Sequence, residues 1–150
     1  MSGENEVELI KMYKAAQEKY IYFLMAAAGS GIGFAIVQTK VEKLAYHHAL
    51  WGLSVVLWAL SFLCGLQFIE HLNSTTFQNA NYLGLKRDLS NCTIEQRKSL
   101  AADVHAVYQS TMDRHQQSME FFGKWQMYLL LSGALCYVVW HIYKMYLVII

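Results

Sequence analysis

The sequence predicts an all-α integral membrane protein with three transmembrane helices, of which the first and third extend into the cytoplasm as amphipathic helices. Three apolar runs, at residues 20–37, 49–69 and 125–143, contain no Asp, Glu, Lys or Arg. At about 1.5 Å per residue, each run is long enough to cross most or all of a hydrocarbon core of about 30 Å. The chain is 55% hydrophobic and contains no proline, which permits long unbroken helices.

The first predicted helix begins before the membrane. Leu9, Tyr13, Ala16 and Tyr20 recur at intervals of three and four residues, which places them on one helical face. This amphipathic segment continues without a helix breaker into a first span at about 20–38. We therefore expect Leu9 and Tyr13 to contribute to a cytoplasmic surface that binds a second copy or a partner.

Small residues concentrate in the first span. The candidate helix-packing or pore-facing residues are Ala27, Gly29, Ser30, Gly31, Gly33 and Ala35. In lipid, small residues four apart let two helix backbones approach closely. Two interpretations remain open: this surface packs against another span of the same chain, or it mediates self-association or lines a pore.

The second predicted span, at about 48–69, is rich in Trp and Leu and is predicted to face lipid. The stretch 73–93 that follows is rich in Asn, Ser and Thr, a composition typical of loops. We expect it to form a cytoplasmic loop, so that residues 70–123 comprise a loop and one helix within a single membrane domain covering 1–150.

A second amphipathic helix is predicted to begin near Thr93, which with Gln96 forms a candidate capping box. Its apolar stripe recurs at steps of three or four residues and comprises Val104, Tyr108, Met112, His115 and Met119. This stripe is predicted to contact a neighbouring copy, the first helix or a soluble partner. The helix leads into a third span at about 124–146, which has aromatic residues at both ends.

Basic residues predict the orientation. Three Lys precede the first span and six Lys or Arg lie in 70–124, against two Lys in the turn at 39–47. Since positive charges remain in the cytoplasm, the N-terminus and the long connection are predicted to be cytoplasmic and the C-terminus external. The predicted location is the plasma membrane, corresponding to the bacterial inner membrane.

Several functions are disfavoured. A net charge of +1 gives no basic field for nucleic acid. None of the spans carries a buried Asp, Glu, Lys or Arg of the kind that marks proton relays or ion-coupled transport. Asp103 with His105, and Asp113 with His115, are two residues apart and diverge on a helix, so we expect no metal site, cofactor or catalytic pair and no enzymatic activity.

Three helices can barely enclose a site, so the sequence favours a homo-oligomer. The leading hypothesis is a membrane channel or pore-forming protein, an effector that alters membrane permeability and is gated through its cytoplasmic helices. Its expected partners are the lipid bilayer, further copies of the chain and a soluble cytoplasmic activator. The alternative is a non-conducting anchor or assembly subunit that recruits a soluble partner.

Overall fold

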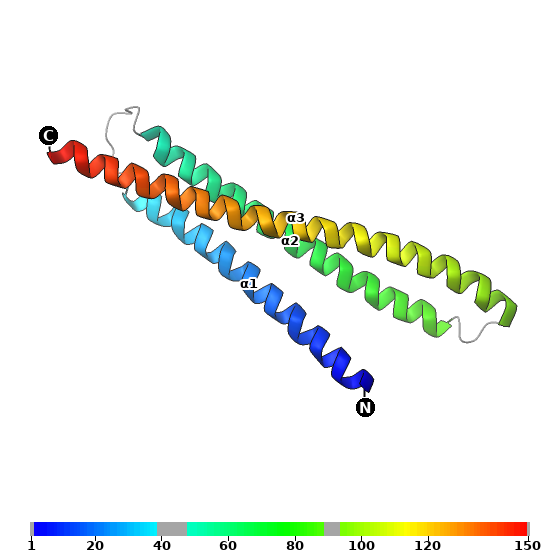
Figure 1. The fold of residues 1–150 in the computed structure, drawn as a ribbon. Helices are drawn as coiled ribbons and strands as arrows, with labels where there is room; N and C mark the ends of the chain where they lie inside the picture. The colour runs from blue at the N-terminus through cyan, green and yellow to red at the C-terminus, as the bar shows by residue number, and fades with distance from the viewer. Residues whose placement is uncertain (1, 39–47, 89–93, 150) are drawn as a thin grey trace. The chain divides into compact units, whose positions relative to one another are not determined.

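The structure is a computed structural model that describes residues 2–38, 48–88 and 94–149. These residues form three helices, α1 (Ser2–Gln38), α2 (His48–Asp88) and α3 (Ile94–Ile149), and no strand (Figure 1). The helices contain 37, 41 and 56 residues, which correspond to lengths of roughly 55, 60 and 85 Å. The prediction of an all-α fold is confirmed.

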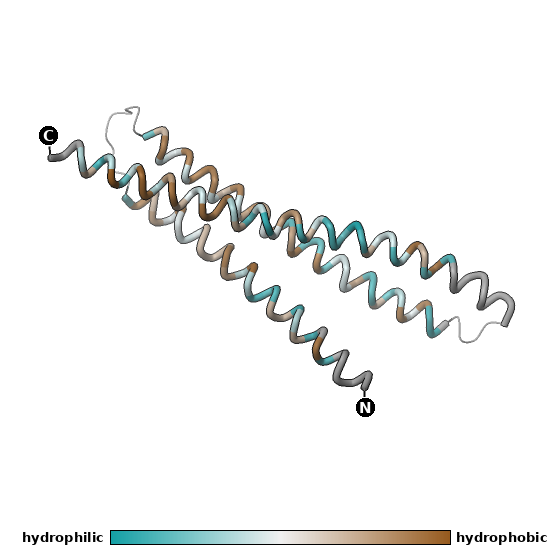
Figure 2. The backbone as a smooth tube through the Cα atoms, in the orientation of Figure 1, coloured by the Kyte–Doolittle hydropathy of each residue, from teal (hydrophilic) through white to brown (hydrophobic). Residues whose placement is uncertain are grey.

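Each helix contains a stretch that is long and apolar enough to cross a membrane. The predicted limits at 38 and 48 coincide with the end of α1 and the start of α2. Hydropathy changes along the other two helices: α2 begins mainly hydrophobic and becomes hydrophilic, whereas α3 changes in the opposite sense (Figure 2). All three helices are longer than a hydrocarbon core of about 30 Å, so each has residues to spare beyond a span.

The predicted loop at 73–93 is wrong for its larger part, because α2 continues as a helix through Asp88. Two threonines of this stretch donate hydrogen bonds back along the helix, Thr75 to the carbonyl of His71 at 2.8 Å and Thr76 to that of Leu72 at 2.9 Å. Hydroxyls bonded four residues back are compatible with a helix interior. The polar composition therefore marked a polar helix rather than a loop.

The predicted start of the second amphipathic helix can be compared only in part. Residues 89–93, including the candidate cap Thr93, lie outside the described residues, and α3 is helical from Ile94. From there α3 continues without a break past Gly123 into the predicted third span. The predicted continuity of this helix is confirmed.

Contacts group the chain into two compact units. Unit 1 comprises Met1–Leu66 and Phe122–Ile150, and unit 2 comprises Gln67–Phe121. Unit 1 thus contains all of α1 with parts of α2 and α3, whereas unit 2 is built from α2 and α3 alone.

The core of unit 1 is built around the indole ring of Trp58, which is 6% exposed. Its Nε1 donates to the carbonyl of Leu130 on α3 at 3.2 Å. Glycines lie against the ring on both sides: a Cβ at Gly31 would come within 3.0 Å of three ring carbons, and a Cβ at Gly133 within 2.7 Å of Cδ1. The large ring fits because α1 and α3 have no side chain at these points. Trp58 forms a buried cluster with Ala28 and Ala35. Six partly buried residues pack against this cluster: Ile32, Trp51, Val55, Phe62, Leu130 and Tyr137.

A second set of contacts in unit 1 involves Gln126, whose side chain is completely buried. Ser61 donates to the backbone carbonyl of Gln126 at 2.8 Å. A Cβ at Gly65 would lie only 2.6 Å from the amide nitrogen of Gln126, so this glycine makes room for the amide. The amide nitrogen and oxygen have no hydrogen-bond partner in the described structure. Tyr137 OH and Trp140 Nε1 of unit 1 are likewise buried without a hydrogen-bond partner among the described residues, so the interior of this unit contains uncompensated polar groups on three side chains.

Unit 2 is a pair of helices joined along a more polar seam. On α2, Phe68, Leu72 and Thr75 are buried, and Asn79 and Tyr82 are half-buried. These five positions follow one another at intervals of four, three, four and three residues, which is the spacing of a helix face packed against another helix. The stretch predicted as a loop therefore supplies one side of unit 2.

Candidate functional site

The small residues of the first span divide into two groups. Ala35 is buried, and Ala27 and Gly31 are half-buried. The backbone of Gly31 lies against the Trp58 ring, and the carbonyl of Ala35 accepts a hydrogen bond from Trp51 Nε1 at 3.2 Å. For Gly31 and Ala35, the structure therefore shows contacts within one chain.

The remaining three small residues face outward. Gly29, Ser30 and Gly33 are exposed, and a Cβ built at either glycine would meet nothing within 4 Å. The two glycines are four residues apart, so they lie on the same side of α1. We call Gly29, Ser30 and Gly33 the open small-residue face.

The predicted stripe on α3 is half-buried at each of its members, Val104, Tyr108, Met112, His115 and Met119. In contrast, the two residues predicted to form a contact surface on the first helix are exposed. Leu9 is 72% exposed and Tyr13 is 64% exposed.

Within unit 2, the helix that the α3 stripe contacts is α2. The Tyr108 ring stacks on Tyr82 with centroids 4.2 Å apart and planes inclined by 20°. The Tyr108 hydroxyl donates a short hydrogen bond to Oδ1 of Asn79. The His105 ring approaches Tyr82 edge-on, with centroids 6.3 Å apart. Sequence analysis missed α2 as a partner because it assigned these α2 residues to a loop.

Two histidines meet in the same unit. Nδ1 of His71 and Nδ1 of His115 are 3.0 Å apart, so one ring donates its proton to the other. Nε2 of His115 lies 3.1 Å from the side-chain amide of Gln78. Both histidines are half-buried. Three side chains from two helices thus form a continuous hydrogen-bonded chain.

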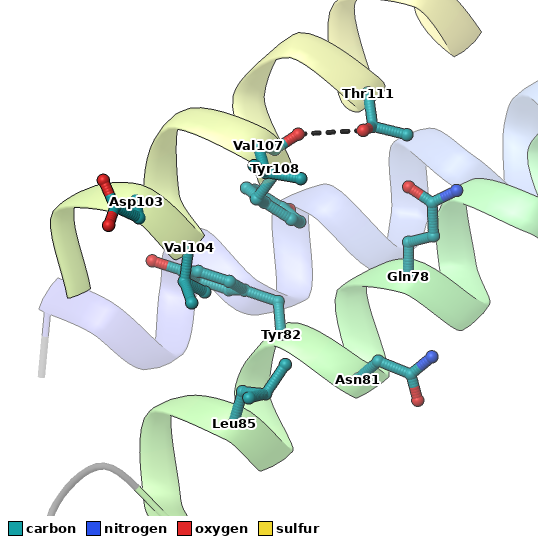
Figure 3. Close-up of a pocket in the computed structure, with 9 residues that line it drawn as sticks. All are labelled: Gln78, Asn81, Tyr82, Leu85, Asp103, Val104, Val107, Tyr108 and Thr111. Atoms are coloured by element: carbon teal, nitrogen blue, oxygen red, sulfur yellow. Dashed lines mark hydrogen bonds between the residues drawn. The ribbon is translucent and has the colours of Figure 1, made fainter. Parts of the chain in front are cut away.

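An open pocket of about 490 Å³ lies in unit 2 beside the tyrosine stack (Figure 3). Its walls combine apolar side chains with amides, hydroxyls and a carboxylate, contributed by Gln78, Asn81, Tyr82, Leu85, Asp103, Val104, Val107, Tyr108 and Thr111. The Thr111 hydroxyl donates to the carbonyl of Val107 at 2.8 Å, so the α3 backbone already holds this hydroxyl (Figure 3). Mixed apolar and polar lining of this kind is typical of sites that bind small molecules or short segments of protein.

The sequence predicted Val104 and Tyr108 of this pocket as part of the α3 stripe. Asp103 was considered only as half of a catalytic pair, and none of the pocket residues on α2 was predicted. The missed signal was the interval of four, three, four and three residues from Phe68 to Tyr82, which predicts a helix face despite the polar composition. The Asn-rich and Thr-rich composition was given more weight than the periodicity.

No cluster of three or more His, Cys, Asp or Glu side chains that could hold a metal ion occurs among the described residues. Comparisons with protein-family models, with curated proteins and with solved structures found no match for this chain. A functional proposal therefore depends on the geometry of the two units.

Proposed function

We propose that the chain is an integral membrane protein that assembles into a homo-oligomeric channel or pore, an effector that alters membrane permeability. Support for a lipid environment comes from the outer surface of unit 1. Large apolar side chains are exposed on all three helices, among them Phe23, Leu63, Leu135 and Ile142. A monomeric soluble protein rarely exposes so many large apolar side chains, whereas lipid solvates them.

The observation that carries the oligomer is the open small-residue face. Helix association in lipid depends on close packing, and two glycines four apart form the groove in which such helices meet. Gly31 and Ala35 already pack within the chain, but Gly29 and Gly33 have open space beside them. A second copy of α1 is the partner that matches this groove, because it presents the same small residues in return.

Within a single chain, the core of unit 1 is filled by the Trp58 ring and the side chains around it, which leaves no path through that core. A path for ions or small solutes would then lie between copies rather than within one. Ser30 and the glycine backbone would supply its polar groups. Unit 2 carries the pocket beside Tyr82 and Tyr108, which we propose as the place where a soluble activator acts on the gate.

In the proposed topology the protein lies in the plasma membrane, the inner membrane of a bacterium. The N-terminus and unit 2 are cytoplasmic and the C-terminus is external, as the distribution of Lys and Arg favours. A membrane-spanning α1 followed by an antiparallel α2 returns the chain to its starting side, which agrees with one location for both cytoplasmic segments.

The test uses full-length protein in mild detergent and in vesicles loaded with dye or potassium. We expect the wild-type chain to be oligomeric by light scattering and its vesicles to leak. The double variant Gly29→Leu/Gly33→Leu should be monomeric and should leave vesicles sealed, with unchanged helix content. Gly52→Leu is the matched control, because a Cβ at Gly52 of α2 also meets nothing within 4 Å and yet lies on another helix. A monomeric wild-type chain whose vesicles stay impermeable would overturn the proposal.

The pocket in unit 2 favours a second candidate function, a non-conducting membrane anchor or assembly subunit that holds a soluble partner. An anchor would need the pocket to hold its partner, but it would not make vesicles leak. The anchor would be favoured over the channel if vesicles carrying the wild-type oligomer stayed sealed and the wild-type chain bound a stoichiometric partner. The variant Val107→Glu should then lose that partner.

A further inference from the structure

We infer that His71 and His115 form a binding site for a divalent late transition metal, represented by Zn²⁺, that joins α2 to α3 within unit 2. Imidazole nitrogen is a preferred ligand of Zn²⁺, Cu²⁺ and Ni²⁺. The inference rests on the geometry of this pair and does not depend on oligomerisation or conduction.

The distance between the two ring nitrogens suits a shared metal. Nδ1 of His71 and Nδ1 of His115 are 3.0 Å apart. In a tetrahedral site with Zn–N bonds of about 2.0–2.1 Å, two ligating nitrogens are separated by about 3.3 Å. The ring centroids are 5.3 Å apart. A tilt of both rings that moves the two nitrogens apart by a few tenths of an ångström and turns them toward a common point would therefore let the same two atoms, which now share a proton, bind one ion.

Gln78 supports the required protonation state of His115. A ring that binds metal through Nδ1 must carry its proton on Nε2, and that N–H is normally held by an oxygen acceptor. In the structure the amide nitrogen of Gln78 lies 3.1 Å from Nε2 of His115 and donates to it. A half-turn of this amide places its oxygen there, so it accepts the Nε2 proton and leaves Nδ1 free to bind. The proton between the rings moves to Nε2 in the bound state, and no other group needs to gain or lose one.

The surroundings leave room for further ligands. Both histidines are half-buried rather than enclosed, so water can complete the coordination sphere. Thr75, one turn after His71, donates its hydroxyl to the His71 carbonyl, which fixes the backbone that carries this ligand. The sequence pattern could not show the site, because its two ligands are 44 residues apart on different helices.

The experiment is a calorimetric titration of the full-length protein with ZnCl₂. The protein carries a purification tag without histidines, is treated with a chelator, and is kept at a slightly basic pH where imidazole is neutral. We expect one Zn²⁺ per chain, with a rise in the melting temperature because the metal binds the folded state. His71→Gln and His115→Gln should each weaken binding at least tenfold.

His105→Gln is the matched control, since His105 lies in the same unit but packs against Tyr82 rather than against another histidine. It should bind Zn²⁺ like the wild type. Gln78→Leu retains both ligands and removes the acceptor, so it should weaken binding about tenfold. Absence of Zn²⁺ binding by the wild type, or equal affinity in the wild type and both ligand variants, would show that the pair is a hydrogen bond only and would overturn the inference.

Discussion

The two units of this chain share helices α2 and α3 but are held together by different contacts. In unit 1, Gly31 and Gly133 allow a single tryptophan ring to lie against two other helices. In unit 2, an aromatic stack, a phenol bonded to an amide and a pair of histidines join two helices. The same two helices thus pack closely at small residues in unit 1 and are joined by polar and aromatic contacts in unit 2.

This difference has a physical basis in the proposed environments of the two units. Among lipid chains, apolar side chains gain little by leaving the solvent, so helix association depends on close contact at small residues. In water, polar groups can lie between two helices at little cost in free energy, because they are hydrogen-bonded to each other and water solvates their outer side. The packing of each unit therefore agrees with the solvent that we propose for it.

The largest effect is expected for the centre of unit 1. Trp58→Ala removes a buried ring and its hydrogen bond to Leu130, and should lower the free energy of unfolding by about 3–5 kcal/mol. Phe23→Ala is the control, because Phe23 is 70% exposed and should cost little. Denaturation in mixed micelles followed by circular dichroism measures both. An equal loss of unfolding free energy in both variants would contradict the distinction between a packed core and an outer apolar surface in unit 1.

The next largest effect tests the helix that sequence analysis missed. Ala80 is exposed on α2, within the stretch predicted as a loop. If this stretch is helical, Ala80→Pro should destabilise unit 2 by about 3 kcal/mol and Ala80→Gly by about 1 kcal/mol. Hydrogen exchange followed by peptide mass spectrometry would localise the loss to residues 67–121. Near-neutral results for both variants would mean that the stretch is a loop after all.

The smallest effect concerns the polar seam of unit 2. Tyr108→Phe retains the stack on Tyr82 and removes the hydroxyl that binds Asn79, which should cost about 1 kcal/mol. Tyr108→Leu also removes the stack and should cost a further 0.5–1.5 kcal/mol, roughly. Thermal unfolding of the two variants separates these contributions. An unchanged melting temperature in both variants would show that the seam contributes little to the cohesion of unit 2.

Much of the architecture could be predicted from the sequence because long apolar runs report directly on helix number. α1 ends at Gln38 and α2 begins at His48, where two of the predicted spans have their limits, but where each helix enters and leaves a membrane stays a prediction. The extension of α2 to Asp88 was missed, since Asn, Ser and Thr favour loops through local hydrogen bonds but also fit a helix when they face water or bond four residues back.

The candidate sites were predictable to a smaller degree. The stripe containing Tyr108 and His115 was identified from its period, but its contacts on α2 were not, because pairing between distant segments leaves no local signal. The small residues of α1 were identified as one group. Their division into an inner and an open set depends on where Trp58 packs, which no spacing in α1 reveals.

The division of these glycines has an evolutionary consequence. The size of residue 31 is tied to that of residue 58 in the same chain, because the two are in contact. The sizes of residues 29 and 33 are not limited by any contact within the described chain, and under the proposed assembly they would be limited by the second copy instead. Among descendants of this chain, a larger side chain at 31 should therefore accompany a smaller one at 58. Changes at 29 and 33 should instead accompany each other, and a lineage that abandoned assembly would be free to vary them while its fold persisted.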